Sequence, residues 1–319
     1  MKRRASDTDP HLWRISKWHP NNSSTSPEVE RLSPACLRIL GGNPGKFSLQ
    51  GTNTYLLGTG PRRLLIDTGH GVPTWIATLT KTLADEKATV QSALLTHWHP
   101  DHIGGVADLL EHSPGTAVYK RDPEDHDGWR DIADGQVFRV EGATLRAVHT
   151  PGHTTDHTVF VFQEEDALFT GDNVLGHGTA VFEDLQTYLQ SLAKMEGLVA
   201  GRGYPGHGAV LPEARAKIAE YISHRHEREK QVLQVLGSAK GSSEDGSNDD
   251  STTNRIARPD RWTAMELVKV IYKSYPESLH GPASAGVLQI LQKLRAEDKV
   301  ASEDDDRWRL LPQEDRSSL

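Results

Sequence analysis

One short stretch, T-H-W-H-P-D-H-I-G-G at 96–105, contains four side chains that can bind a metal ion, all within six consecutive residues. The stretch follows a short apolar run at 90–95, which predicts a buried strand, and I-G-G-V-A-D-L-L from Ile103 predicts the opening of a helix. Side chains between a strand end and a helix start are held by a rigid scaffold. Imidazole and carboxylate together suit zinc, with iron or manganese as alternatives. The spacing therefore favours a metal site over a polar surface loop, with the candidate ligands His97, His99, Asp101 and His102.

Three further turns follow the same pattern, in which an apolar strand is followed by a glycine-containing turn and then by a candidate ligand. They carry His153 in T-P-G-H, Asp172 in T-G-D and His207 in Y-P-G-H. Glycine allows the backbone to turn sharply and to approach a metal closely. Asp67 in L-L-I-D-T-G obeys the pattern too, either as a ligand or as a carboxylate that orients ligand imidazoles.

Strands are predicted in two batches, each accompanied by helices. Apolar and alternating patterns predict strands at 54–57, 63–66, 90–95, 117–119, 136–140, 144–149, 159–162 and 167–170. Helical spacing is found at 72–83, 185–195 and 214–236. Two sheets that pack face to face with helices outside, an αββα sandwich of the α/β class, account for this order.

The chain is predicted to divide into four parts. Residues 1–34 are expected to form a weakly ordered leader, and 35–236 the main domain, which carries all the candidate ligands. Residues 237–260 are expected to be a flexible linker, because 237–254 carry no bulky apolar side chain. Residues 261–312 are expected to form a small winged-helix-like unit, with helices at 263–275 and 284–295 and a short ribbon made by Val300 and 308–311.

Composition excludes several classes of protein. The 319 residues carry a net charge of -8, which gives no electrostatic footprint for nucleic acid. No apolar run approaches the length of a membrane span, and the N-terminal stretch has no secretory signal, so we expect a cytoplasmic protein that does not bind membranes. The single Cys36 fits a reducing compartment and leaves His, Asp and Glu as metal ligands.

Asp67, the H-x-H-x-D-H pattern and the three further ligand turns together resemble the metallo-β-lactamase superfamily over roughly residues 35–230. The resemblance implies two zinc ions, with Asp172 between them. It places the first ion on His97, His99 and His153, and the second on Asp101, His102 and His207. It also implies a catalytic role for Asp101, which would take or give a proton during turnover.

A narrower resemblance rests on residues 41–60, on 171–192 and on the C-terminal unit. These segments are similar to the fungal thioesterases that release polyketides, such as atrochrysone carboxylic acid, from the acyl carrier protein of a non-reducing polyketide synthase in secondary metabolism. They are also similar to the β-lactamase-like endoribonuclease of animal mitochondria. T-H-W-H-P-D-H-I-G-G-V and His177 favour the fungal group. The resemblance implies a zinc-dependent hydrolase that acts on a polyketide thioester, with a metal-dependent single-strand endoribonuclease as the alternative.

Charge disfavours the RNA alternative, because an RNA enzyme needs clusters of Lys and Arg that neutralise phosphates. The stretch 261–311 carries eight Lys and Arg against eight Asp and Glu. An acidic carrier protein would still need a local basic patch for docking. The candidates are Lys120 with Arg121, and Arg225, Arg228 and Lys230.

Overall fold

A computed structural model describes residues 27–46, 48–123, 126–238, 261–303 and 306–312. The described residues fall into two compact units, of which the first runs to Glu183 and continues from Thr187 to Ala219. The second comprises Asp184–Gln186 and the residues from Glu220 onward. Most of the predicted leader and nearly all of the predicted linker lie outside the described residues, so the four boundaries stay predictions.

The first sheet has six strands in the order in which the chain makes them. Its first four strands pair antiparallel, whereas β4, β5 and β6 pair parallel. The parallel pairs need crossovers, which helices supply. The strands are β1 (Val29–Ser33), β2 (Cys36–Leu40), β3 (Asn53–Leu57), β4 (Arg62–Ile66), β5 (Thr89–Leu94) and β6 (Ala117–Tyr119).

The second sheet has five strands in the order β11-β10-β9-β8-β7. Its pairs are antiparallel except for β10 and β11, which are parallel. The strands are β7 (Val137–Val140), β8 (Ala143–His149), β9 (Thr158–Phe162), β10 (Ala167–Gly171) and β11 (Gly203–Pro205).

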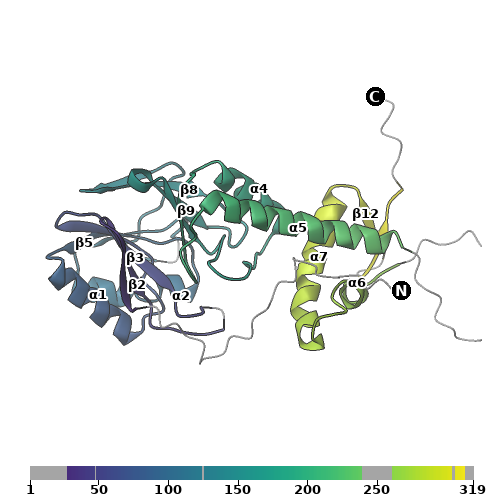
Figure 1. The fold of residues 1–319 in the computed structure, drawn as a ribbon, viewed down its shortest axis with the longest axis horizontal. Helices are drawn as coiled ribbons and strands as arrows, with labels where there is room; N and C mark the ends of the chain where they lie inside the picture. The colour runs from purple at the N-terminus through teal and green to yellow at the C-terminus, as the bar shows by residue number, and fades with distance from the viewer. Residues whose placement is uncertain (1–26, 47, 124–125, 239–260, 304–305, 313–319) are drawn as a thin grey trace, which may run out of the picture. The chain divides into compact units, whose positions relative to one another are not determined.

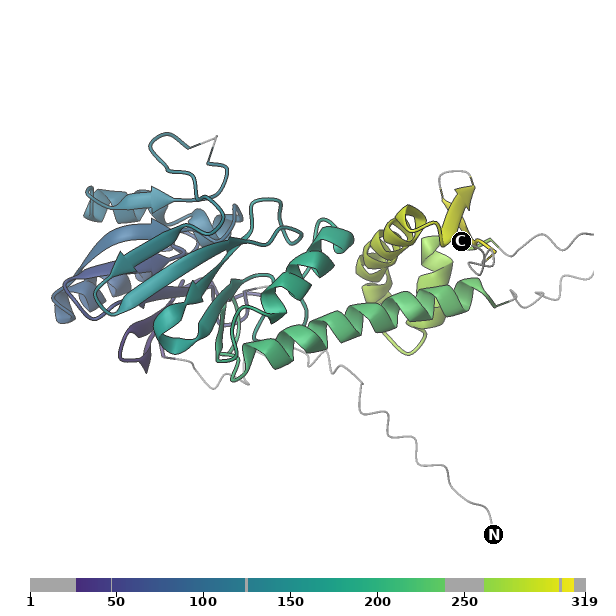
Figure 2. The ribbon, with the colours of Figure 1, turned by 90° about the horizontal axis from the view of Figure 1, so that it is seen from above.

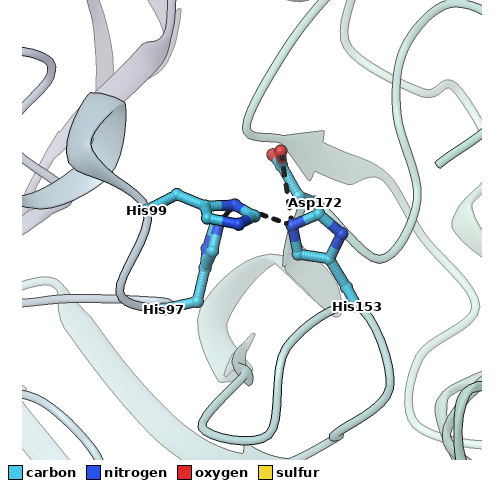
Figure 3. Close-up of side chains that lie close together, drawn as sticks. All are labelled: His97, His99, His153 and Asp172. Atoms are coloured by element: carbon cyan, nitrogen blue, oxygen red, sulfur yellow. Dashed lines mark hydrogen bonds and ion pairs between the residues drawn. The ribbon is translucent and has the colours of Figure 1, made fainter. Parts of the chain in front are cut away.

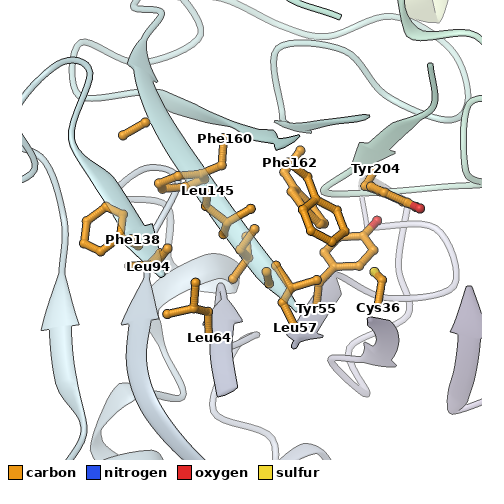
Figure 4. Close-up of a cluster of buried hydrophobic side chains, with 14 of the residues drawn as sticks. Cys36, Tyr55, Leu57, Leu64, Leu94, Phe138, Leu145, Phe160, Phe162 and Tyr204 are labelled. Atoms are coloured by element: carbon orange, nitrogen blue, oxygen red, sulfur yellow. The ribbon is translucent and has the colours of Figure 1, made fainter. Parts of the chain in front are cut away.

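The main hydrophobic core lies between the two sheets (Figure 4). Tyr55 of the first sheet packs edge-on against Phe169 of the second, with ring centroids 5.0 Å apart. The Tyr55 hydroxyl donates to the Pro205 carbonyl at 2.7 Å, so that this buried polar group is satisfied across the core. The two sheets are therefore fixed relative to each other.

Helices cover the outer faces of the two sheets (Figures 1 and 2). Helix α1 (Pro73–Asp85) buries Trp75, Leu79 and Leu83 against the first sheet. Helix α4 (Leu185–Glu196) packs on the turns that leave the second sheet, where the Tyr188 hydroxyl donates to the Asn173 carbonyl at 2.6 Å. This is the predicted αββα sandwich.

The second unit contains the last part of α5 (Ala214–Leu236), two further helices and a two-stranded ribbon. A capping box formed by Thr263 and Glu266 starts helix α6. The prediction that this helix continues to Tyr275 is wrong: it ends at Ile271, and Pro276 disfavours helical backbone at the residue before it. Helix α7 begins earlier than expected, at His280. The elements are α6 (Ala264–Ile271), η2 (Glu277–Leu279), α7 (His280–Ala296), β12 (Val300–Glu303) and β13 (Arg307–Leu310).

Sequence patterns missed the strands β1, β2 and β11. Strand β2 contains the buried Arg38, which interrupts its apolar run, and β11 is three residues long and contains glycine and proline. Throughout the part of the chain that the structure describes, helices long and apolar enough to cross a membrane are absent.

Candidate metal centre

The stretch after β5 delivers four of the seven predicted ligands. His97 and His99 lie in the connection from β5 to the short helix α2 (Pro100–Ile103). The sequence predicts one helix that opens at Ile103, whereas the structure has a short helix that ends at Ile103 and a second that begins at Val106. The short helix starts at Pro100, a favourable first helical residue because its fixed backbone angle suits the helix and its missing N–H would be unpaired there. Asp101 and His102 therefore project from a helix rather than from a loop.

Close backbone contacts fix the end of this segment. Helix α3 (Val106–His112) follows after Gly104 and Gly105. A Cβ atom at Gly105 would lie 2.1 Å from the Thr68 carbonyl oxygen and 2.6 Å from the Trp75 ring. Only glycine fits at this position, so the ligand segment is anchored where α3 begins.

The other three predicted ligands follow strands of the second sheet. His153 comes after β8, Asp172 directly after β10, and His207 after β11. The backbone passes so close to the site that a Cβ at Gly206 would lie 2.3 Å from Asp172 Oδ1. Strand ends of both sheets thus meet at one edge of the sandwich.

The seven side chains gather into two donor groups. The first donor group is His97, His99, His153 and Asp172 (Figure 3). The second donor group is Asp101, His102 and His207. Within each group the potential ligand atoms lie within 4.8 Å of one another. All seven ligands expected from the sequence are therefore brought together.

Asp172 lies between the two groups. Its Oδ2 atom is 3.3 Å from His207 Nε2 and 3.9 Å from His153 Nε2. Its Oδ1 atom is 3.5 Å from His102 Nε2. One carboxylate therefore reaches histidines of both groups, as a bridging ligand must.

Hydrogen bonds behind the imidazoles turn their lone pairs toward the site. The Thr96 hydroxyl donates to Asp67 Oδ2 at 2.9 Å, so it accepts from His97 Nδ1, also at 2.9 Å. His102 Nδ1 donates to the same carboxylate oxygen at 2.7 Å. Both rings therefore keep a proton on Nδ1, on the far side from the site, and turn Nε2, the atom that can bind metal, toward it.

His153 is oriented in the same way, because its Nδ1 donates to the Val181 carbonyl oxygen at 2.8 Å. Its Nε2 lies 3.1 Å from His99 Nδ1, which in turn lies 2.9 Å from His97 Nε2. A single N–H on His99 can satisfy only one of these two lone pairs. A shared cation satisfies all three rings, so the residues fit a metal ion.

Asp67 supports the site from behind. Its Oδ1 accepts from the Thr96 backbone N–H at 2.8 Å, while Oδ2 holds Thr96 and His102. Its backbone adopts a φ of 56°, which non-glycine residues rarely do. Of the two roles open for Asp67, orienting the ligands is the one that these contacts support.

Charge differs between the two groups in the metal-free chain. Burial lowers the pKa of His97 and of His99, with neighbouring histidines adding to the effect. Burial also opposes the charged form of His207, but Asp172 and Asp101 overcome it and raise the pKa of His207 to about 10. A cation entering the second donor group must therefore displace protons.

Comparison with known proteins agrees with this geometry. Residues 48–207, half of the chain, match the Metallo-beta-lactamase superfamily. The chain belongs to the metallo-β-lactamase superfamily. Residues 263–308 match the Beta-lactamase associated winged helix domain, as expected for the C-terminal unit.

Curated relatives cover most of the chain. It is 46% identical over 280 residues to the atrochrysone carboxyl ACP thioesterase of Aspergillus chevalieri, spanning 87% of this chain and 86% of that protein. It is 47% identical to the lactamase-like protein ptaB of Pestalotiopsis fici, over 86% of this chain and 84% of that protein. It is 54% identical to the thioesterase pkgB of Emericella nidulans, over 66% of this chain and 62% of that protein.

Solved structures support the fold. A beta-lactamase domain protein from Burkholderia ambifaria superposes with a TM-score of 0.72 at 18% identity, covering 92% of this chain and 96% of its own. A metallo-beta-lactamase family protein from Thermus thermophilus gives 0.65 at 24% identity, covering 88% of this chain and 100% of its own. At these identities the likeness extends to the fold alone.

The sequence patterns missed a hydrogen-bonded chain that ends on Asp101. Asn43 Oδ1 accepts from the Thr52 backbone N–H at 2.9 Å, and Asn43 Nδ2 donates to the Thr52 hydroxyl at 3.0 Å. The hydroxyl is thereby left to donate to Asp101 Oδ2, at 3.1 Å. The buried Thr52 thus holds the orientation of Asp101 in this metallo-β-lactamase site.

Other histidines near the ligands divide into two kinds. His157 is buried, and its Nε2 accepts from the Asp172 backbone N–H at 3.1 Å, so it supports the carboxylate between the groups. His149 Nε2 instead lies within hydrogen-bonding distance of the Thr155 carbonyl oxygen, at 2.9 Å. The His177 side chain is exposed. Neither His149 nor His177 belongs to a donor group.

The expectation that Lys120 contributes to a basic docking patch is wrong. Its ammonium is buried and lies 2.7 Å from Asp156 Oδ2. Asp156 is in the turn that carries His153 and His157, and Lys120 follows β6 of the other sheet. The pair therefore ties the ligand turn of one sheet to the edge of the other, where its charge is shielded from a partner.

Proposed function

We propose that the protein is a zinc-dependent thioesterase that hydrolyses a polyketide acyl thioester carried by the acyl carrier protein of a non-reducing polyketide synthase. The supporting observation is a pair of adjoining donor groups in a chain 46% identical to an acyl-carrier-protein thioesterase. We also propose that two ions are held, one by each donor group, and that Asp172 bridges them. A cytoplasmic location stays a prediction.

A bound metal supplies two effects in such a site: it lowers the pKa of water to about 7 and it polarises a carbonyl oxygen. The protein supplies the orientation. Asp67 and Thr96 direct the His97 and His102 lone pairs, and His157 holds the Asp172 backbone. These contacts keep the ligands in place without requiring the substrate.

Asp101 is the group we propose to move the proton. Hydrolysis forms a bond between the water oxygen and the carbonyl carbon and breaks the C–S bond, so one proton must leave the water and one must reach the sulfur. Burial raises the pKa of Asp101, but the hydrogen bond from His207 and the charge of His102 hold it well below its usual range. A simple thiol has a pKa near 8.5, so its thiolate needs little help to leave.

A thioester is preferred to RNA on two grounds. Two of the relatives described above are named thioesterases. The stretch 261–311 has equal numbers of basic and acidic residues, whereas an RNA enzyme gains affinity from each phosphate that it neutralises. With Lys120 excluded, Arg121 and the cluster of Arg225, Arg228 and Lys230 remain the proposed docking residues for an acidic carrier protein.

The test offers both substrates to one zinc-loaded preparation. A carrier-protein-bound polyketide and a single-stranded RNA are incubated in parallel with the wild-type protein and with the Asp101→Ala variant. We expect free acid from the wild type, intact RNA, and a loss of roughly 10²–10⁴-fold in thioester hydrolysis in the variant, the usual contribution of a positioned acid or base. RNA cleavage that disappears in the variant, with the thioester intact, would reverse the assignment.

A further inference from the structure

Two large hydrophobic side chains are exposed in the described residues of the first compact unit. Trp98 is 46% exposed and Val181 is 67% exposed. A single exposed apolar residue needs no explanation, because folded proteins leave much apolar surface in water. The position of these two residues makes them notable.

Both residues contact the first donor group directly. Trp98 lies between the two ligands His97 and His99, and its ring meets that of His99 at a centroid distance of 4.5 Å. The Val181 carbonyl accepts the hydrogen bond from His153. The His99 and His153 rings are themselves 4.8 Å apart, so the two apolar residues flank one pair of histidines.

The backbone of each residue is fixed by the metal centre, while its side chain is left in water. Trp98 cannot move far, because the residues before and after it both belong to the first donor group. Val181 is held through its carbonyl oxygen. Two fixed apolar side chains beside a reactive centre are suited to hold an apolar part of the substrate, since a ligand that covers them removes apolar surface from water.

We propose that Trp98 and Val181 bind the acyl part of the substrate and select acyl groups that are apolar and carry flat rings. This inference rests on the proposed function, because it concerns the group attached to the thioester carbonyl. The indole face offers a stacking surface for a flat ring, and Val181 adds an aliphatic contact. Short or strongly polar acyl groups gain nothing from either side chain.

Two thioesters of N-acetylcysteamine, which differ only in the acyl group, test the selection. One carries 2-naphthoyl and the other acetyl. We expect Trp98→Ala to lower kcat/KM for the naphthoyl thioester by about fivefold to tenfold, the loss of one aromatic contact, and to leave the acetyl thioester within about twofold. Trp98→Phe should restore most of the loss, and Val181→Ser should give a smaller loss with the same preference.

Trp129→Ala is the matched control. Trp129 also lies on a histidine ring, that of His126, with centroids 3.8 Å apart, but His126 is in neither donor group. This variant should treat both thioesters as the wild type does. An equal loss for both thioesters in Trp98→Ala, or the same loss in Trp129→Ala, would overturn the inference.

Binding separates this inference from the proposed function. Calorimetric titration of the metal-loaded protein with 2-naphthoate measures the apolar contact without any hydrolysis. Weaker binding in Trp98→Ala, with unchanged binding in Trp129→Ala, supports the inference even if neither thioester is hydrolysed. Equal binding in all variants overturns it even if hydrolysis proceeds.

Discussion

The Thr52 hydroxyl orients Asp101 and takes no part in the proposed reaction. The Thr52 hydroxyl is committed as a donor, because the Asn43 side chain fixes the direction of the hydrogen bonds around it. A hydrogen bond to a charged group contributes about 1.5–3 kcal/mol. Thr52 is therefore a positioning residue for Asp101, the carboxylate that we propose to move the proton.

Replacing Thr52 with Val keeps the side-chain shape and removes the hydroxyl. We expect kcat to fall by roughly tenfold or more, by the free energy of one charged hydrogen bond, while KM and the metal content stay as in the wild type. Thr52→Ser should retain activity because it keeps the donor. Steady-state kinetics and elemental analysis measure both quantities, and a Thr52→Val enzyme with wild-type kcat would contradict the role.

Residue type and local order were enough to predict all seven candidate ligands, because each lies in a recognisable sequence pattern shortly after a strand. Thr52 and Lys120 could not be assigned in this way. Their roles depend on partners 49 and 36 positions away, Asp101 and Asp156, which only the folded chain brings near. A hydroxyl and an ammonium group are too common in sequences to indicate such contacts.

At the scale of elements, the site depends on the ends of strands from two different sheets staying close to one another. The pair formed by Lys120 and Asp156 lies at this junction, and Thr154 donates to the other oxygen of Asp156 at 2.6 Å. Removing one partner of a buried ion pair costs about 3–5 kcal/mol, because the remaining charge is left unpaired. The strands themselves were mostly predictable, except where Arg38, glycine or proline disturbed the apolar pattern.

Lys120→Met should therefore lower the free energy of unfolding by about 3 kcal/mol. The double variant Lys120→Met with Asp156→Leu should recover at least half of the loss, since no charge is then buried alone. Denaturant unfolding followed by circular dichroism measures both. If Lys120→Met unfolds at the wild-type midpoint, the pair does not tie the sheets together.

At the scale of the whole molecule, a metal held by both sheets should also stabilise the fold. His97 and His99 come from the first sheet, and His153, Asp172 and His207 from the second. We expect elemental analysis to find two metal ions per chain, and a chelator to lower Tm, because the ions bind the folded state alone. Fewer than one ion per chain after purification without chelator, or an unchanged Tm, would contradict the two-ion assignment.

The order of the ligands along the chain also sets a sequence of events during synthesis. The first donor group is complete once Asp172 has been made, whereas the second waits for His207. The ribosome makes the chain from its N-terminus, so a chain that has grown past Asp172 but not to His207 contains every residue of the first donor group and lacks one imidazole of the second. The second donor group is consequently the last to be completed each time the protein is made.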